Sequence, residues 1–187
     1  MICLLGLGAS VGEHLVGNRL RPAQQRLQQA SHLLQQLPRS RLMAQSALYH
    51  SRAWGNLRAG AYLNAAALLQ TRLPPGTLLR RLLDIEFVCG RRRQRKRWGK
   101  RALDIDVLLL GSQQLQSNQL QVPHTWLWQR EFALRPALDV LRTLSRHDDA
   151  DSFALIPRTW PGSIARRLTR LCGYHLHRPL RILSAPA

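Results

Sequence analysis

The stretch Ala102-Leu103-Asp104-Ile105-Asp106-Val107-Leu108-Leu109-Leu110 has the alternating pattern of a β-strand with one apolar face. The apolar face is predicted to carry every second residue, namely Leu103, Ile105, Val107 and Leu109. Asp104 and Asp106 therefore point together to the other face. Carboxylates two positions apart on a strand lie about 6.6 Å from each other and, at an effective dielectric constant of about 20, repel by about 2.5 kcal/mol. A bound divalent cation would remove this repulsion, so the pair is a candidate metal site.

The segment before this strand is strongly basic. It runs Gly90-Arg91-Arg92-Arg93-Gln94-Arg95-Lys96-Arg97-Trp98-Gly99-Lys100-Arg101 and holds eight cationic side chains. Their mutual repulsion favours an extended surface loop that binds a polyanion. Arginines for phosphate oxygens beside paired acids for magnesium are what phosphoryl-type transfer requires. An arginine run is also typical of nucleic-acid-binding modules, which is the alternative from another functional class.

Length and charge limit the possibilities further. The chain has 187 residues and 45% hydrophobic content, which predicts one domain, spanning residues 1–187, rather than two. The net charge of +18 predicts affinity for anions. No Gly-x-x-x-x-Gly-Lys-Ser/Thr motif is present, so the phosphate site is not that of an ordinary P-loop kinase.

The cysteines and the apolar segments indicate the compartment. Cys3, Cys89 and Cys172 are odd in number and widely spaced, which argues against a disulfide framework. Cys172 lies near His175 and His177, but a fourth ligand for a structural zinc site is missing. No apolar run approaches the roughly 18 residues of a transmembrane helix. We expect a soluble cytoplasmic monomer with no membrane partner.

Periodicity and turn residues predict the order of the elements. Strands are expected at Ile2–Leu7, Met43–Tyr49, Tyr62–Thr71 and Ala102–Leu110, with a loop at Ser51–Ala61. One helix is expected from Pro22 to Pro38, and a second is opened by Pro74-Pro75-Gly76-Thr77 and stopped by Gly90. The alanines of 62–71 suit a helix equally well, but the alternation favours a strand. The resulting β-α-β-β-α-β order predicts an α+β fold of the ferredoxin-like type, an antiparallel sheet with two helices on one side.

The remainder of the chain is expected to add helices to this core. Helices are predicted near Leu127 to Leu144, and Ser163 is predicted to cap a last helix through Cys172. Residues 145–160 are predicted to form a surface insertion, and the tail from residue 179 is predicted to be loose.

Three spaced motifs give the chain a resemblance to a known family. They are Gly90-Arg91-x-Arg93 with Arg97-Trp98-Gly99-Lys100-Arg101-Ala102-Leu103-Asp104-Ile105-Asp106, Tyr62-Leu63-Asn64-Ala65-Ala66, and Val122-Pro123-His124 through Arg130-x-Phe132. With these motifs the chain resembles the 6-hydroxymethyl-7,8-dihydropterin pyrophosphokinases of folate biosynthesis, from about Ile2 to Val140. The resemblance implies transfer of a pyrophosphoryl group from ATP to the pterin hydroxymethyl group, giving AMP and the pterin diphosphate.

The resemblance also implies roles for single residues. Asp104 and Asp106 are expected to bind two Mg²⁺ ions and, with Arg91, Arg101 and Trp98, to form the catalytic group. ATP is expected to contact a set of mostly cationic residues: Glu86, Arg91, Arg93, Arg101, His124 and Arg130. The pterin is expected between the rings of Tyr62 and Phe132, with Asn64 at its edge and with Ser51 and Trp54 nearby. Trp98 is expected to close the basic loop over the substrates.

Some positions depart from the family pattern. The first strand usually ends in Gly-Ser-Asn, whereas this chain has Gly8-Ala9-Ser10, and the family's Thr-Pro-Pro appears as Ser51-Arg52-Ala53. Thr125 replaces the common aromatic residue after His124. These changes fall around the pterin and adenosine contacts and leave open a degenerate pterin-binding protein without turnover. Association with another folate enzyme is left open by the sequence, and a nucleic-acid partner is not expected under the family resemblance.

Overall fold

A computed structural model describes residues 1–12, 20–53, 60–90, 101–146, 156–174 and 181–183 of the chain. Its helices and strands follow one another as β1 (Ile2–Gly12), α1 (Leu20–Gln35), β2 (Ser40–Gln45), β3 (Leu48–Arg52), β4 (Ala61–Thr71), α2 (Pro75–Val88), β5 (Asp104–Leu110), β6 (Leu115–Gln116), β7 (Gln121–Val122), the 3₁₀ turn η2 (Leu127–Gln129), α3 (Glu131–Arg146), α5 (Thr159–Tyr174) and β8 (Arg181–Leu183).

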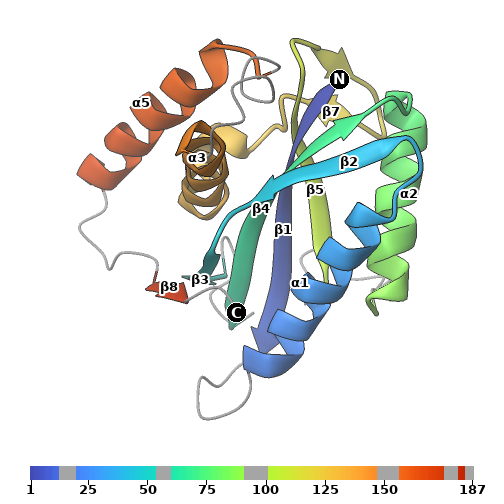
Figure 1. Cartoon of the computed structure of the whole chain (residues 1–187). Helices are drawn as coiled ribbons and strands as arrows, with labels where there is room; N and C mark the ends of the chain where they lie inside the picture. The colour runs from blue at the N-terminus through green and yellow to red at the C-terminus, as the bar shows by residue number, and fades with distance from the viewer. Residues whose placement is uncertain (13–19, 54–59, 91–100, 147–155, 175–180, 184–187) are drawn as a thin grey trace.

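The main sheet confirms the predicted ferredoxin-like order. Its strands lie in the order β5-β1-β4-β3-β8, with β2 also paired to β4, and the pairings are antiparallel (Figure 1). β1 and β4 occupy the centre because each of the two β-α-β connections leaves one strand between its own pair. A separate two-stranded ribbon joins β6 and β7.

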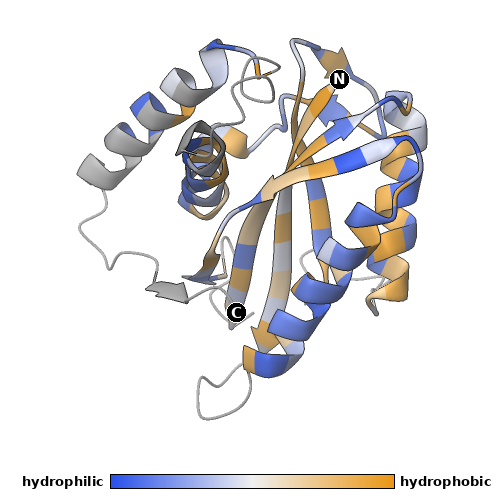
Figure 2. Ribbon diagram, viewed as in Figure 1, coloured by the Kyte–Doolittle hydropathy of each residue, from blue (hydrophilic) through white to orange (hydrophobic). Residues whose placement is uncertain are grey.

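Two helices cover one face of this sheet, as predicted. α1 and α2 pack there on a cluster of buried apolar residues that includes Leu27 and Leu34 of α1 and Leu78 and Leu82 of α2 (Figures 1 and 2). The predicted period of α1 is confirmed, because the buried positions recur at three- and four-residue spacing. We call this set the first cluster.

The opposite face of the sheet is covered by α3 and α5. Their apolar residues meet Leu4, Leu68 and Leu108 of the sheet in a second cluster. Trp160 and Ile164 bring α5 into this cluster. The sheet is therefore buried on both faces, as the nearly unbroken apolar run of β4 requires.

The strand predicted at Met43–Tyr49 is two strands. Ser46 and Ala47 lie between them: the Ser46 hydroxyl accepts a hydrogen bond from the N–H of Ala66 in β4, and the Ala47 N–H donates to Asp139 Oδ2 of α3 at 2.9 Å. Asp139 also hydrogen-bonds the Tyr49 side chain, and burial together with this carboxylate raises the pKa of Tyr49 to about 12. One acid of α3 thus holds the break between β2 and β3.

A β-bulge corrects the prediction for Leu109. The pairing of β1 with β5 shifts between Leu4 and Leu5, where Leu109 and Val107 are their partners. The extra residue, Leu108, reverses the alternation. Leu109 consequently packs in the second cluster and not beside Val107, while Leu110 takes a place in the first cluster.

The C-terminal predictions also need correction. Ser163 lies within α5, which begins at Thr159, and its hydroxyl accepts a hydrogen bond from Arg166. Residues 181–183 of the predicted loose tail form β8, which pairs with β3. The predicted insertion has both ends inside helices, and Ile156 and Trp160 are buried. Residues 147–155 lie outside the described part of the chain.

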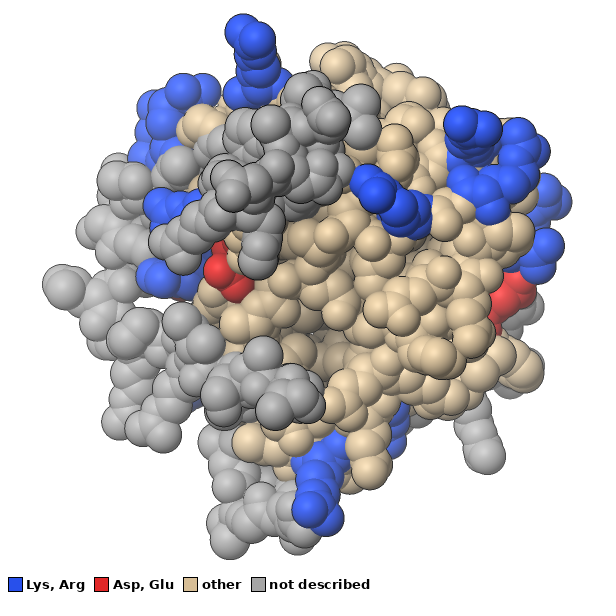
Figure 3. Space-filling model, in the orientation of Figure 1, with Lys and Arg blue, Asp and Glu red and all other residues tan. Residues whose placement is uncertain are grey.

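The surface reflects the charge of the sequence. Figure 3 shows lysine and arginine side chains gathered at the margins of one face, with little acidic surface beside them. In the described ranges, no helix combines the length and the apolar character that crossing a membrane requires.

Candidate active site

The two aspartates lie on the face of β5 that looks toward α3. Ile105 and Val107 pack in the first cluster, so Asp104 and Asp106 point to the opposite side of the sheet. Their side chains are 25% and 34% exposed. The shared face predicted from the alternation is confirmed, and both carboxylates are within reach of solvent.

Glycine lies beside the aspartates on β1. Gly8 pairs with Asp104 of β5 on one side and with Asn64 of β4 on the other, and Gly6 pairs with Asp106. With a strand spacing of about 4.8 Å, Asp104 and Asn64 stand about 10 Å apart across Gly8. No side chain rises between them at this register position. A Cβ atom at Gly8 would lie 3.6 Å from Asn64 Oδ1, whereas Leu108 already fills the space above Gly6.

Each aspartate has a cationic neighbour. Arg101 Nη1 lies 2.6 Å from Asp104 Oδ2. Asp106 Oδ2 lies 3.8 Å from Arg130 Nη1 and 3.9 Å from His124 Nε2. The predicted site residues therefore form two neighbouring groups. Arg101 pairs with Asp104, and Asp106 lies close to both His124 and Arg130.

Burial and charge set the protonation of these groups. Burial lowers the pKa of Arg101, but the charge and hydrogen bond of Asp104 outweigh it, and the net shift is upward. Burial lowers the pKa of Arg130 against the opposing charge of Asp106. Burial, with the charge of Arg130, lowers the pKa of His124 to about 4. The site thus has two permanent cations and an imidazole that is neutral at neutral pH.

Backbone contacts set the orientation of His124. Its N–H donates to the carbonyl of Leu108 in β5 at 3.0 Å, which fixes the residue beside the aspartate strand. Its Nδ1 accepts a hydrogen bond from the N–H of Trp126 at 3.2 Å. A neutral imidazole that accepts at Nδ1 carries its proton at Nε2, so this N–H faces Asp106. His124 can donate to an anionic oxygen without carrying charge itself.

Glu86 supports the aspartate strand from within the protein. Its side chain is 1% exposed, and its Oε1 accepts a hydrogen bond of 2.6 Å from the N–H of Ile105, the residue between the two aspartates. An edge strand has N–H groups that no neighbouring strand satisfies, and Glu86 satisfies this one. A direct contact of Glu86 with ATP stays a prediction.

Three of the residues predicted for the pterin, Ser51, Tyr62 and Asn64, meet across β3 and β4. Asn64 is buried, and its Nδ2 donates to Ser51 Oγ at 2.9 Å. Tyr62 shares a face with Asn64, because two positions separate them on β4, and it pairs with Ser51 of β3. Ser51 therefore holds the Asn64 amide, whose Oδ1 lies on the side of Gly8.

Phe132 belongs to the other half of the site. It lies in the first turn of α3, and the Arg130 guanidinium carbon stands 5.7 Å from the centroid of its ring. At this distance the cation interacts with the face of the ring. Phe132 thereby joins the phosphate-binding candidates to the pterin-binding candidates.

Four predicted residues lie outside the described part of the chain: Arg91, Arg93, Trp98 and Trp54. The roles predicted for them stay predictions. No role in the site was predicted for Gly6 and Gly8. The sequence signal for such a role is that the two glycines lie two positions apart on β1, which places both on the same face as the aspartates.

The acids present fit a magnesium site of a particular kind. Among the described residues no group of three or more His, Cys, Asp and Glu side chains could hold a metal ion. Mg²⁺ is commonly held by one or two carboxylates, with substrate phosphates and water completing its octahedron. The donor set of Asp104 and Asp106 matches that arrangement and not a fully protein-bound ion.

Comparison with known proteins agrees with this chemistry. Residues 5–142 match the model of the 7,8-dihydro-6-hydroxymethylpterin-pyrophosphokinase family. A 2-amino-4-hydroxy-6-hydroxymethyldihydropteridine pyrophosphokinase of Pseudomonas aeruginosa is 38% identical over 133 residues, which are 71% of this chain and 82% of the relative. The protein of that name from Haemophilus influenzae is 36% identical over 129 residues, 69% of this chain and 80% of the relative.

A third relative is a longer protein. A folate synthesis bifunctional protein of Arabidopsis thaliana is 38% identical over 95 residues, which are 51% of this chain and 19% of the relative. Since the family match covers most of the chain, the chain belongs to the 7,8-dihydro-6-hydroxymethylpterin-pyrophosphokinase family and is an ATP-dependent enzyme of folate biosynthesis that transfers pyrophosphate to hydroxymethyldihydropterin.

Proposed function

We propose that this transfer takes place on the α3 side of β5, β1 and β4, with ATP held by Arg101, His124 and Arg130 and the pterin held near Asn64. The supporting observation is the position of Asp106, whose Oδ2 lies within 4 Å of both His124 and Arg130. A carboxylate of β5 for a cation is thus brought together with two donors for phosphate oxygens, His124 and Arg130, which stand on either side of η2. Family membership decides against a nucleic-acid-binding module as the main activity.

The reaction requires one bond to form and one to break. The hydroxymethyl oxygen of the pterin bonds to the β-phosphorus of ATP, the bond from this phosphorus to the oxygen bridging to the α-phosphorus breaks, and AMP leaves with that oxygen. The hydroxyl proton is released. Two Mg²⁺ ions on Asp104 and Asp106 would neutralise the phosphates and lower their repulsion of the attacking oxygen. The number of ions is part of the proposal.

The arginines have two roles in this scheme. Arg101 lies beside Asp104 and Arg130 beside Asp106, where their charges balance those of the two carboxylates. When the carboxylates bind cations, the guanidinium groups can turn to the phosphate oxygens, to which they donate two hydrogen bonds each. His124, neutral and with its proton on Nε2, adds a third donor that needs no counter-ion.

The pterin half of the site is built for a flat, polar heterocycle. Asn64 is the amide predicted to bind its edge, and Ser51 fixes the rotamer of that amide. Tyr62 and Phe132 are the rings predicted to stack on it. Stacking on an aromatic ring contributes about 1 to 3 kcal/mol for a nucleic-acid base, and a bicyclic pterin is of similar size. Residues 1–187 are proposed to act as one domain and as a monomer in the cytoplasm.

The test is the formation of AMP by an Asp106→Ala variant. Purified protein is incubated with ATP, Mg²⁺ and 6-hydroxymethyl-7,8-dihydropterin, and AMP is measured by chromatography. We expect the rate to fall by about a thousandfold or more, because loss of one charge-stabilising group at a transferring phosphate has effects of that order. Asp84→Ala is the matched control, since Asp84 is an exposed acid on α2 with an ion pair to Arg81.

Two outcomes would contradict the proposal. An Asp106→Ala variant that is folded by circular dichroism and keeps most of its activity would remove the metal-binding role. Wild-type protein that binds the pterin but forms no AMP would show a binding protein without turnover, which is the alternative that the altered Ser51-Arg52-Ala53 stretch raises.

A further inference from the structure

α5 contacts the candidate active site from beyond the family match. The match ends at residue 142, and α5 begins at Thr159. Nε of Arg167 in α5 donates a hydrogen bond to the backbone carbonyl of Trp128 in η2. The residues lie 39 positions apart in the sequence, so only the packing of α5 brings them together.

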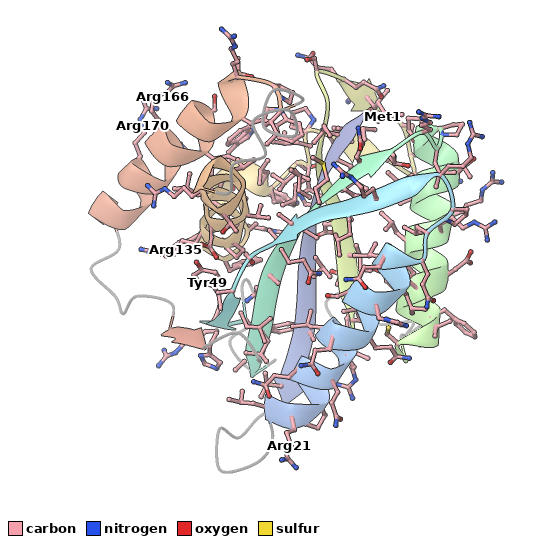
Figure 4. The ribbon with its side chains drawn as sticks, viewed as in Figure 1. Met1, Arg21, Tyr49, Arg135, Arg166 and Arg170 are labelled. Carbon is pink, nitrogen blue, oxygen red and sulfur yellow. The ribbon has the colours of Figure 1, made fainter. Side chains whose placement is uncertain are left out.

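The other arginine side chains described in α5 point away from the site. Arg166 and Arg170 are exposed, and Figure 4 shows both pointing away from α3 and into solvent. Arg167 is half-buried and turns inward. A guanidinium that leaves bulk water for a single backbone carbonyl loses hydration, and such a contact persists where packing fixes both partners.

Packing fixes both partners in this case. Leu127 of η2 and Ile164 of α5 are fully buried, and Trp160 is 5% exposed. All three belong to the second cluster, and Trp128 packs against its edge. The burial of Ile164 therefore fixes the α5 backbone one helical turn before Arg167.

The Trp128 carbonyl lies in the turn that links two phosphate-binding candidates. His124 precedes η2, and the Leu127 N–H donates to its carbonyl at 2.9 Å. Arg130 follows η2, and its N–H donates to the carbonyl of Leu127 at 3.3 Å. The turn thus sets the separation of the two side chains that flank Asp106.

We propose that Arg167 is a positioning residue for the nucleotide half of the active site. By donating to the Trp128 carbonyl it holds η2 in the form that directs His124 and Arg130 to the phosphates beside Asp106. This inference rests on the proposed function, because it assigns to these two residues the binding of ATP. Residues beyond the family match would then contribute to the family reaction in this chain.

The experiment compares Arg167→Ala with Arg170→Ala. Arg170 has the same chemistry and lies on the same helix, but it faces solvent, so its loss controls for charge. Titration calorimetry measures the binding of a nonhydrolysable ATP analogue in the presence of Mg²⁺, and a separate titration measures the binding of the pterin. We expect Arg167→Ala to weaken nucleotide binding about three- to tenfold and to leave pterin binding and the fraction of folded protein unchanged. Arg170→Ala should bind both ligands like the wild type.

Two further variants test the route of the effect. Arg167→Lys keeps the charge but has no N–H at the position of Nε, so we expect it to resemble Arg167→Ala. In an Arg130→Ala background, the effect of Arg167→Ala should fall below half its size, because residues that act through one another are not additive. Full additivity, or a lysine variant that binds like the wild type, would overturn the proposal.

The outcomes also separate this inference from the proposed function. If the wild type does not bind the nucleotide with Mg²⁺, or if Asp106→Ala binds it unchanged, the proposed function fails. If the wild type depends on Asp106 and Arg167→Ala binds the nucleotide like the wild type, only the positioning role fails. Equal weakening of nucleotide and pterin binding in Arg167→Ala would indicate a general structural role and would also overturn the inference.

Discussion

At the scale of the single residue, Gly8 shapes the surface of the sheet at the proposed site. It belongs to a buried central strand, and it leaves the sheet surface open between Asp104 and Asn64. Neighbouring backbone does not demand glycine there, because a Cβ atom would make ordinary contact with Asn64 Oδ1 at 3.6 Å. Its role in the proposed site is therefore to leave room for the substrate.

A Gly8→Ala variant tests this role. We expect a normal fold and a pterin KM raised by about tenfold or more, because one methyl group too many in a fitted site has effects of this size. The measurement is steady-state kinetics at saturating ATP. Gly76→Ala is the control, since a Cβ atom on that helical residue would meet no atom within 4 Å. An unchanged KM in Gly8→Ala would place the pterin elsewhere.

The side chains of the site were predictable to different degrees. The shared face of Asp104 and Asp106 followed from the period of a strand, whereas the convergence of His124 and Arg130 was implied by the family resemblance. The burial of Glu86 was not predictable, because a glutamate on an amphipathic helix is ordinarily exposed. Glu86 accepts a hydrogen bond from the Ile105 N–H on the edge strand β5, and the sheet order decides which strand is at the edge.

At the scale of the element, α2 holds β5 through one hydrogen bond in addition to apolar packing. We expect Glu86→Ala to lower the free energy of unfolding by about 1 to 3 kcal/mol, since the Ile105 N–H would be left buried without its acceptor. Glu86→Gln keeps an acceptor oxygen and should lose less. Urea denaturation measures both, and Asp84→Ala on the exposed side of α2 should show no change. Equal losses for the alanine and glutamine variants would indicate that the charge, and not the hydrogen bond, is what matters.

Local sequence patterns predicted the helices and strands that have a regular hydrophobic period or a clear start residue. The bounds of β4 and α2 were predicted within two residues, because alternation and a proline start are local signals. The break between β2 and β3 was missed because Asp139, about ninety positions away, takes up the Ala47 N–H. The face of Leu109 was missed because the bulge depends on how β1 pairs with β5.

At the scale of the whole molecule, the net positive charge of the protein affects its two substrates differently. A net charge of +18 attracts ATP over a distance, whereas the pterin is neutral. We expect kcat/KM for ATP to fall about tenfold between 0.05 and 0.5 M NaCl, because screening shortens the reach of the charges from roughly 14 Å to roughly 4 Å. The value for the pterin should change little. An equal fall for both substrates would indicate a loss of stability and not of electrostatic attraction.

The C-terminal part was the least predictable from sequence. Ser163 suggested a helix start that lies inside α5, and the three residues of β8 are too few for a period to be recognised. Both elements take their places from long-range contacts, α5 on α3 and β8 on β3. The sequence predicted the core of the fold from local patterns, and these additions depend on that core being in place.

The pairing of β8 with β3 has a consequence for storage and concentration of the protein. A strand edge with free N–H and carbonyl groups can recruit a strand from a second molecule and begin aggregation. β8 covers the edge of β3 with a segment of the same chain, and a three-residue strand that begins with Arg181 is a poor template for further growth. Removal of residues 181–183 would expose Tyr49 and its neighbours at a longer edge, so the shortened protein should precipitate at lower concentration than the intact one.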